Sequence, residues 1–87
     1  MSIYRYSQSK IIDELTIKRS EGGHVRAYIH VADNTDPQML GTILSGIEKQ
    51  GWQFNPNSLG GKPVLEVHGV GLESRFVKFV ESAGWAQ

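Results

Sequence analysis

Two neighbouring stretches in the first third of the chain alternate between apolar and polar side chains. Over 11–19, alternate positions divide into two sets that a strand would place on opposite sides. The mainly apolar set is Ile11, Leu15 and Ile17, and the more polar set is Ile12, Glu14, Thr16 and Lys18. Over 24–32, the same alternation sets Val25, Ala27, Ile29 and Val31 against Arg26, Tyr28 and His30. A period of two predicts half-buried β-strands. The intervening Ser20-Glu21-Gly22-Gly23 predicts a hairpin turn between them.

The hydrophobic spacing then changes to that of a helix. Asp36-Pro37 is a favourable start, because Asp caps free backbone amides and Pro suits the first helical position. Thr35 and Gln38 offer a capping box one residue earlier, so two starts remain open. We predict a helix to about residue 50, ended by Gly51. Its apolar stripe consists of Met39, Leu40, Ile43, Leu44 and Ile47.

The second half of the chain predicts two further strands and a second helix. Residues 52–55 indicate a short strand, 56–63 are rich in Asn, Gly and Pro and predict a loop, and 64–70 alternate as a clear strand. A helix follows over 72–83, and Gly84 ends it. Its buried stripe consists of Leu72, Phe76, Phe79, Val80 and Ala83. Residues 1–10 have no clear period, and we expect a flexible arm or a short strand there.

This order of elements predicts an α+β fold over 1–87, in a single domain. We expect a two-layer ββαββα sandwich, with a mostly antiparallel sheet and two helices on one face. The two helical regions also resemble each other at an offset of 33, and both end in Gly-Trp. We favour shared helix-docking geometry over duplication as the reason. Trp52 is expected in the core, and Trp85 is expected either in the core or at an interface.

Composition narrows the possible partners. Nine Lys and Arg balance nine Asp and Glu, which argues against a dedicated duplex-DNA binder. There is no cysteine, so disulfides and thiolate metal sites are excluded, and a reducing, cytoplasmic location is expected. No stretch approaches the roughly 20 apolar residues of a membrane span, and 1–10 contain no signal-peptide core, so no membrane partner is expected.

Two helices on one side of a sheet leave the other side open. Period-two geometry assigns eight residues to that open side: Glu14, Thr16, Lys18, Arg26, Tyr28, His30, Glu66 and His68. From this surface and the flanks of the first hairpin we take six candidate partner-binding residues: Lys18, Arg19, Arg26, Tyr28, His30 and His68. An aromatic ring on a sheet with flanking Arg and Lys is also one way of holding single-stranded RNA.

The sequence indicates no chemistry at this surface. His30, Glu66 and His68 are metal-ligand types, but no spacing brings His30 to the other two, so solvated strand residues are favoured. Gly60-Gly61-Lys62 precedes a strand instead of opening a helix, which favours a hairpin turn over a phosphate loop. Since there is no Gly-x-Ser-x-Gly motif and no cysteine, we predict no catalytic residue, no metal, no cofactor and no enzymatic activity.

Two segments resemble the translation initiation factor 1 family. VLEVHG over 64–69 is similar to that family's final strand, and FVKFVESAGW over 76–85 to its final helix. The element order over 11–85 also matches. The resemblance implies binding to RNA or the ribosome, but family members carry a basic loop between the first two strands, where this chain has Ser20-Glu21-Gly22-Gly23-His24. Val70 also stands where the family has an acidic residue. Only Arg19 and Arg26, which flank the hairpin, are carried over.

Two functional hypotheses follow. The first is a small non-enzymatic module that binds a protein partner, either another protein or a second copy of itself, through the open sheet face or an edge strand. Edge strands favour this hypothesis because their unpaired backbone groups are templates for pairing. The second is an RNA- or ribosome-binding protein resembling translation initiation factor 1.

Overall fold

The computed structural model describes residues 1–20, 22, 24–33, 35–71 and 73–85. Its elements are β1 (Ser2–Arg5), β2 (Ile12–Arg19), β3 (Val25–Val31), α1 (Pro37–Lys49), β4 (Gln53–Leu59), β5 (Lys62–His68) and α2 (Glu73–Ser82). After β1, the predicted ββαββα order and α+β class are confirmed. Leu72 of the predicted apolar stripe, and Glu21 and Gly23 of the predicted turn, lie outside the described residues.

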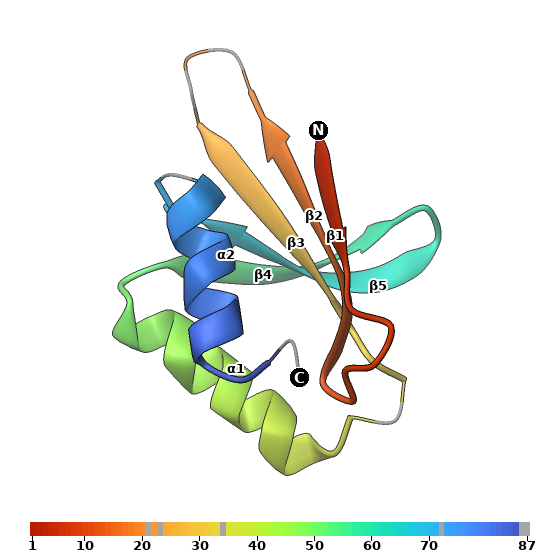
Figure 1. The fold of residues 1–87 in the computed structure, drawn as a ribbon. Helices are drawn as coiled ribbons and strands as arrows, with labels where there is room; N and C mark the ends of the chain where they lie inside the picture. The colour runs from red at the N-terminus through yellow and green to blue at the C-terminus, as the bar shows by residue number, and fades with distance from the viewer. Residues whose placement is uncertain (21, 23, 34, 72, 86–87) are drawn as a thin grey trace.

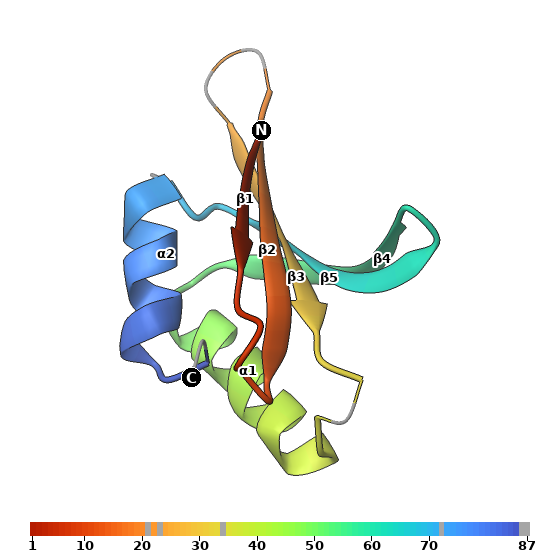
Figure 2. The ribbon, with the colours of Figure 1, turned by 45° about the vertical axis from the view of Figure 1, so that its right-hand side comes forward.

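The five strands form one antiparallel sheet in the order β1-β2-β3-β5-β4. Both helices lie on one side of it, as predicted (Figures 1 and 2). The β4–β5 hairpin crosses β1–β3 at a steep angle in Figure 1, so the sheet is strongly twisted. Within the described residues, no helix has both the length and the apolar character needed to cross a membrane.

The core fills the space between the sheet and the two helices. Register places apolar residues of neighbouring strands opposite each other on this side, for example Leu15 opposite Ile29 and Ala27 opposite Val67. The helices add fully buried Ile43, Ile47, Phe76 and Val80. The predicted stripe of α1 is therefore confirmed at its centre, while its neighbour Leu40 is 38% exposed.

The start of α1 follows the Asp36-Pro37 signal. The Asp36 side chain accepts a hydrogen bond of 2.9 Å from the Met39 amide, and Pro37 occupies the first turn. The alternative capping box is not used. Thr35 instead donates its hydroxyl to the Ile11 carbonyl at 2.8 Å, which ties the helix start to the beginning of β2.

The predicted phase of the first hairpin strand was wrong at its beginning. Ile12 was placed with the polar residues, but it is fully buried with Leu15. The reason is a β-bulge, since the register with β3 shifts between Ile12 and Glu14. The extra residue in a bulge resets the alternation, so Ile12 and Leu15 reach the same face although they are three residues apart.

The predicted loop over 56–63 was also wrong, because most of it belongs to β4 and β5. Polar, Pro-containing sequence is compatible with a strand here, since β4 is an edge strand exposed along most of its length. The turn is reduced to Gly60-Gly61, whose φ angles are 61° and 81°. Two consecutive positive φ angles suit a two-residue hairpin turn, and they fix Leu59 opposite Lys62.

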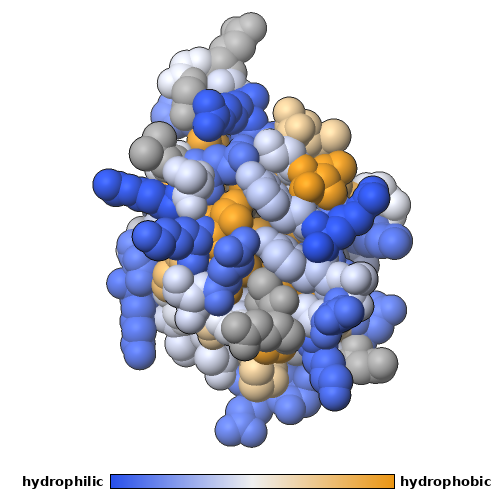
Figure 3. Space-filling model, in the orientation of Figure 1, coloured by the Kyte–Doolittle hydropathy of each residue, from blue (hydrophilic) through white to orange (hydrophobic). Residues whose placement is uncertain are grey.

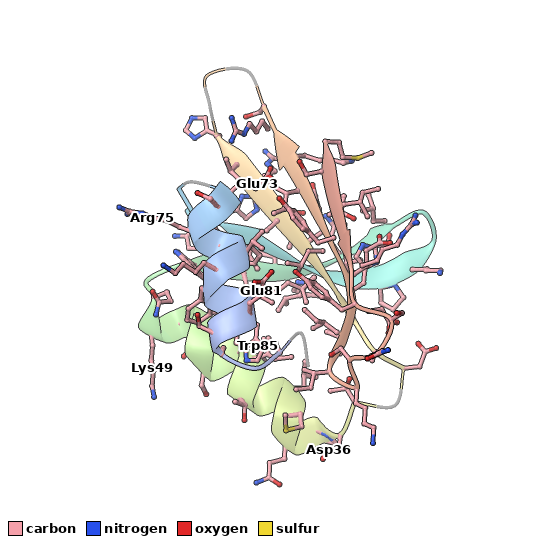
Figure 4. The ribbon with its side chains drawn as sticks, viewed as in Figure 1. Asp36, Lys49, Glu73, Arg75, Glu81 and Trp85 are labelled. Atoms are coloured by element: carbon pink, nitrogen blue, oxygen red, sulfur yellow. The ribbon has the colours of Figure 1, made fainter. Side chains whose placement is uncertain are left out.

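Of the two expectations for residues 1–10, the short strand is correct. β1 pairs with β2, with Tyr4 opposite Leu15. The Tyr4 hydroxyl also donates a hydrogen bond of 2.6 Å to Glu73 at the start of α2. Figure 4 shows Glu73 on the side of α2 that is turned toward these strands, whereas Arg75 points away. This bond joins the edge of the sheet to the helix layer.

The repeated Gly-Trp sequence corresponds to the same helix ending used twice. The Trp52 amide bonds to the Ile47 carbonyl and the Trp85 amide to the Val80 carbonyl, each from a position following a glycine with positive φ. This is the Schellman pattern. Both indoles then pack edge-on against Phe79, at 5.1 and 5.3 Å between ring centroids. Trp85 is only 3% exposed, so it is a core residue.

Candidate functional site

The side of the sheet opposite the helices, called the open face below, is the candidate surface. The strand register assigns its members through directly opposed pairs. They are Ile3 and Arg5 of β1, Glu14, Thr16 and Lys18 of β2, Arg26, Tyr28 and His30 of β3, Lys62, Val64, Glu66 and His68 of β5, and Gln53, Asn55, Asn57 and Leu59 of β4.

Five of the six candidate partner-binding residues come together on this face. Lys18 stands opposite Arg26, and Arg26 opposite His68, in one row across three strands. Arg19 does not join them. Arg19 pairs with Val25, so its side chain belongs to the other side of the sheet. The hydrogen bond from Tyr4 is the main cause that lowers the pKa of Glu73 on α2, and the positive charge of Arg19 lowers it further.

The centre of the open face is buried, and the prediction of solvated strand residues at His30, Glu66 and His68 was wrong for Glu66. Thr16, Tyr28 and Glu66 form one row and are 3%, 7% and 8% exposed. Long side chains from adjacent rows cover them. The Lys18 ammonium, for instance, lies 5.5 Å from the centre of the Tyr28 ring. The accessible part of the surface is therefore its periphery.

One end of the open face is organised around Glu14. Its carboxylate lies 3.3 Å from Arg5 Nε through one oxygen, and 3.5 Å from His30 Nε2 through the other. The Thr16 hydroxyl lies 3.1 Å from the same imidazole nitrogen. This carboxylate is therefore already engaged from two neighbouring strands.

A second cluster is centred on Glu66. Asn57 donates an amide hydrogen bond to one carboxylate oxygen, and His68 Nε2 lies 2.6 Å from the other. The hydrogen bond from Asn57 is the main reason that the pKa of Glu66 is held below its ordinary value. The nearby charges of His68 and Arg26 also lower this pKa, whereas burial of the carboxylate raises it.

This shift predicts acid sensitivity. Because the folded pKa of Glu66 lies below its ordinary 4.5, the carboxylate stabilises the fold above that pH, and its contribution is lost as pH falls through the folded value. We expect Asn57→Ala to reduce the loss of unfolding free energy between neutral and acidic pH, measured by urea denaturation. Asn55→Ala is the matched control, since Asn55 is opposite Glu66 but no hydrogen bond between them is recorded. If the unfolding free energy of wild type and of both variants changes equally with pH, the hydrogen bond from Asn57 is not what lowers the pKa of Glu66.

The geometry does not bring the candidate metal ligands together. His68 is opposite Arg26, whereas His30 lies four residues further along β3, about 13 Å away at the usual rise of a strand. Across the described ranges, no group of three or more His, Asp or Glu side chains is placed to hold a metal ion.

The balanced composition hides an uneven distribution of charge. The open face holds four Lys or Arg (Arg5, Lys18, Arg26 and Lys62) and two Glu (Glu14 and Glu66). Of the nine charges of each sign, this leaves five basic and seven acidic residues for the rest of the sequence. The open face is thus net positive although the chain is neutral.

Sequence reasoning missed the contributions of β1 and the β4–β5 hairpin tip to this surface. Ile3 and Arg5 were overlooked because residues 1–10 show no clear period. The hairpin turn predicted at Gly60-Gly61 is correct, but Leu59 and Lys62 on either side of it were assigned to the loop over 56–63. Extending the two strands up to the turn would have paired these residues and placed them on one face.

Comparisons of this chain with protein-family models, with curated proteins and with solved structures find no match.

Proposed function

We propose that this protein is a small non-enzymatic interaction module that binds a protein partner through its open face. One observation carries the proposal. The two carboxylates of the face are engaged within it, whereas no ion pair is recorded for Lys18, Arg26 or Lys62 within the described part of the chain. Cationic side chains around a buried, hydrogen-bonded centre form a surface that attracts a partner of opposite charge and fixes its orientation.

The open face is favoured over the edge strands. β4 contains Pro56, which lacks the amide that a pairing strand requires, so this edge is poorly suited to strand addition. β1 offers only four residues for pairing. A peptide added to either edge would therefore gain few backbone hydrogen bonds.

A protein is favoured over RNA, the alternative suggested by the resemblance to translation initiation factor 1. Nonspecific single-strand binding relies on exposed aromatic rings against which bases stack. Among the described residues Tyr28 is the one Phe, Tyr or Trp of the open face, and it is 7% exposed beneath Lys18. The cysteine-free sequence supports a reducing compartment, and we place the interaction in the cytoplasm.

Charge reversal tests the proposal. A variant carrying Lys18→Glu, Arg26→Glu and Lys62→Glu is expected to lose protein partners that the wild type captures from a lysate of the source cells. Capture should persist after ribonuclease treatment, because a protein is the proposed partner. Sedimentation of the purified wild type would identify a second copy of the chain as the partner.

The matched control reverses three exposed cations on the helices: Lys49, Arg75 and Lys78. It has the same change in net charge and is expected to capture the same proteins as wild type. Equal capture by both triple variants, or loss of capture with ribonuclease, contradicts the proposal. Circular dichroism of all three proteins checks that the fold is retained.

A further inference from the structure

A shallow, open hollow of about 450 Å³ lies on the open face, between the edge strand β1 and the tip of the β4–β5 hairpin. Its lining includes Ile3, Thr16, Lys18, Leu59, Gly60 and Lys62. β1 and β4 are the two opposite edges of the sheet in strand order. Side chains from both margins of the twisted sheet therefore line the same hollow.

The local geometry explains which side chains line the hollow. Register places Ile3 opposite Thr16, so Ile3 projects from the open face, where it is 45% exposed. The two-glycine turn fixes Leu59 opposite Lys62 and directs both to the same face. Figure 3 shows hydrophobic surface at the amino end of β1, bordered by hydrophilic surface. An exposed apolar side chain at a concave site on a polar face marks a place for an apolar contact.

The charges of the hollow determine what kind of group fits beside that contact. Lys18 and Lys62 both line it, and no ion pair is recorded for either within the described residues. The carboxylate of Glu14, which also contributes to the lining, is engaged by Arg5 and His30. An apolar group with carboxylates on its flanks is complementary to this lining, whereas a basic segment would be repelled.

We propose that the hollow binds an acidic segment of the protein partner, with an aliphatic side chain inserted between Ile3 and Leu59 and carboxylates reaching Lys18 and Lys62. This inference rests on the proposed function above and specifies its partner. The aliphatic anchor supplies affinity by burying apolar surface, and the two lysines select against neutral and basic sequences.

Nuclear magnetic resonance titration of the ¹⁵N-labelled protein tests the site directly. The probe is a short synthetic peptide of glutamate and serine with one central leucine, and its control has serine in place of leucine. We expect amide shifts at Ile3, Lys18 and 59–62, and binding of the control peptide weaker by about tenfold or more, as loss of one buried aliphatic side chain implies. Equal affinity of the two peptides, absence of shifts, or shifts confined to α1 and α2 would overturn the proposal.

Two serine substitutions provide a matched pair on the protein. Ile3→Ser is expected to weaken the leucine peptide by about tenfold, because the apolar wall of the hollow is removed. Leu40→Ser changes a similarly exposed residue on α1 and should leave binding unchanged. One outcome would separate this inference from the proposed function. If Ile3→Ser still binds the peptide and captures the same proteins, but the triple reversal of Lys18, Arg26 and Lys62 loses those proteins, the partner binds the open face outside the hollow. Stronger shifts with a single-stranded RNA oligonucleotide than with either peptide would contradict both the hollow as a peptide site and the open face as a protein-binding surface.

Discussion

Replacing Trp85 with alanine is expected to destabilise the protein by about 3–5 kcal/mol, as is usual when a large buried aromatic side chain is removed. Trp85 is 3% exposed, stacks edge-on against Phe79, and accepts a hydrogen bond of 2.7 Å at its carbonyl from Ser9. Figure 4 shows it between the end of α2 and α1. For a domain of this size the loss is a large part of the total stability, and urea denaturation followed by circular dichroism would measure it.

A pair of glycines on α1 provides an independent check of that packing. A methyl group at Gly46 would lie 2.9 Å from the Trp85 indole, whereas one at Gly41 would meet nothing within 4 Å. We expect Gly41→Ala to stabilise by about 0.5–1 kcal/mol through helix propensity. Gly46→Ala should be the less stable of the two by about 1–3 kcal/mol, because overpacking opposes the same gain. Equal effects of the two substitutions would mean that Trp85 does not pack against α1.

Replacing Tyr28 with alanine is expected to cost about 3 kcal/mol of stability, although Tyr28 lies on the sheet side away from the helices. Its ring is 7% exposed, with Thr16 and Glu66 directly opposite and Lys18 above it. Tyr28→Phe keeps the ring, and we expect it to remain within about 1 kcal/mol of wild type. Denaturant unfolding of both variants separates the ring from the hydroxyl.

This prediction bears on the choice of residues for binding experiments. If Tyr28→Ala unfolds the open face, loss of binding in that variant says nothing about contact with a partner. Exposed Arg26 and Lys62 are better probes, because their removal leaves the buried row of Thr16, Tyr28 and Glu66 in place. A Tyr28→Ala variant of wild-type stability would instead identify Tyr28 as a surface residue.

The residues that could be predicted from sequence alone are those whose neighbours follow a regular period. The alternation over β3 correctly assigned Ala27 and Ile29 to the core side and Arg26 and His30 to the other. Asp36-Pro37 correctly predicted the start of α1, because a cap acts within one turn of the chain. Local signals of this kind depend on a few adjacent residues and need no knowledge of the rest of the fold.

Other features of the fold depend on residues that are distant in sequence, and for these the local sequence pattern gave a wrong prediction. The bulge at Asp13 interrupts the period of β2, so Ile12 was given the wrong side. β4 is a strand because β5 supplies its hydrogen bonds, although Pro56 and the neighbouring polar residues resemble a loop. Tyr28 was expected to be exposed, and its burial results from Lys18 and Glu66 on adjacent strands.

By itself, then, the sequence determined the α+β class, the element order after β1 and the phase of most open-face residues, because periodicity and capping are local properties. Only the tertiary structure decided which of those residues are accessible. It engaged Glu14 with Arg5 and His30 and Glu66 with His68, and it brought Ile3 and Leu59 from opposite edges of the sheet to one hollow. Strand register and sheet twist are set by contacts across the whole chain, and they convert a neutral sequence into a protein with one net positive face.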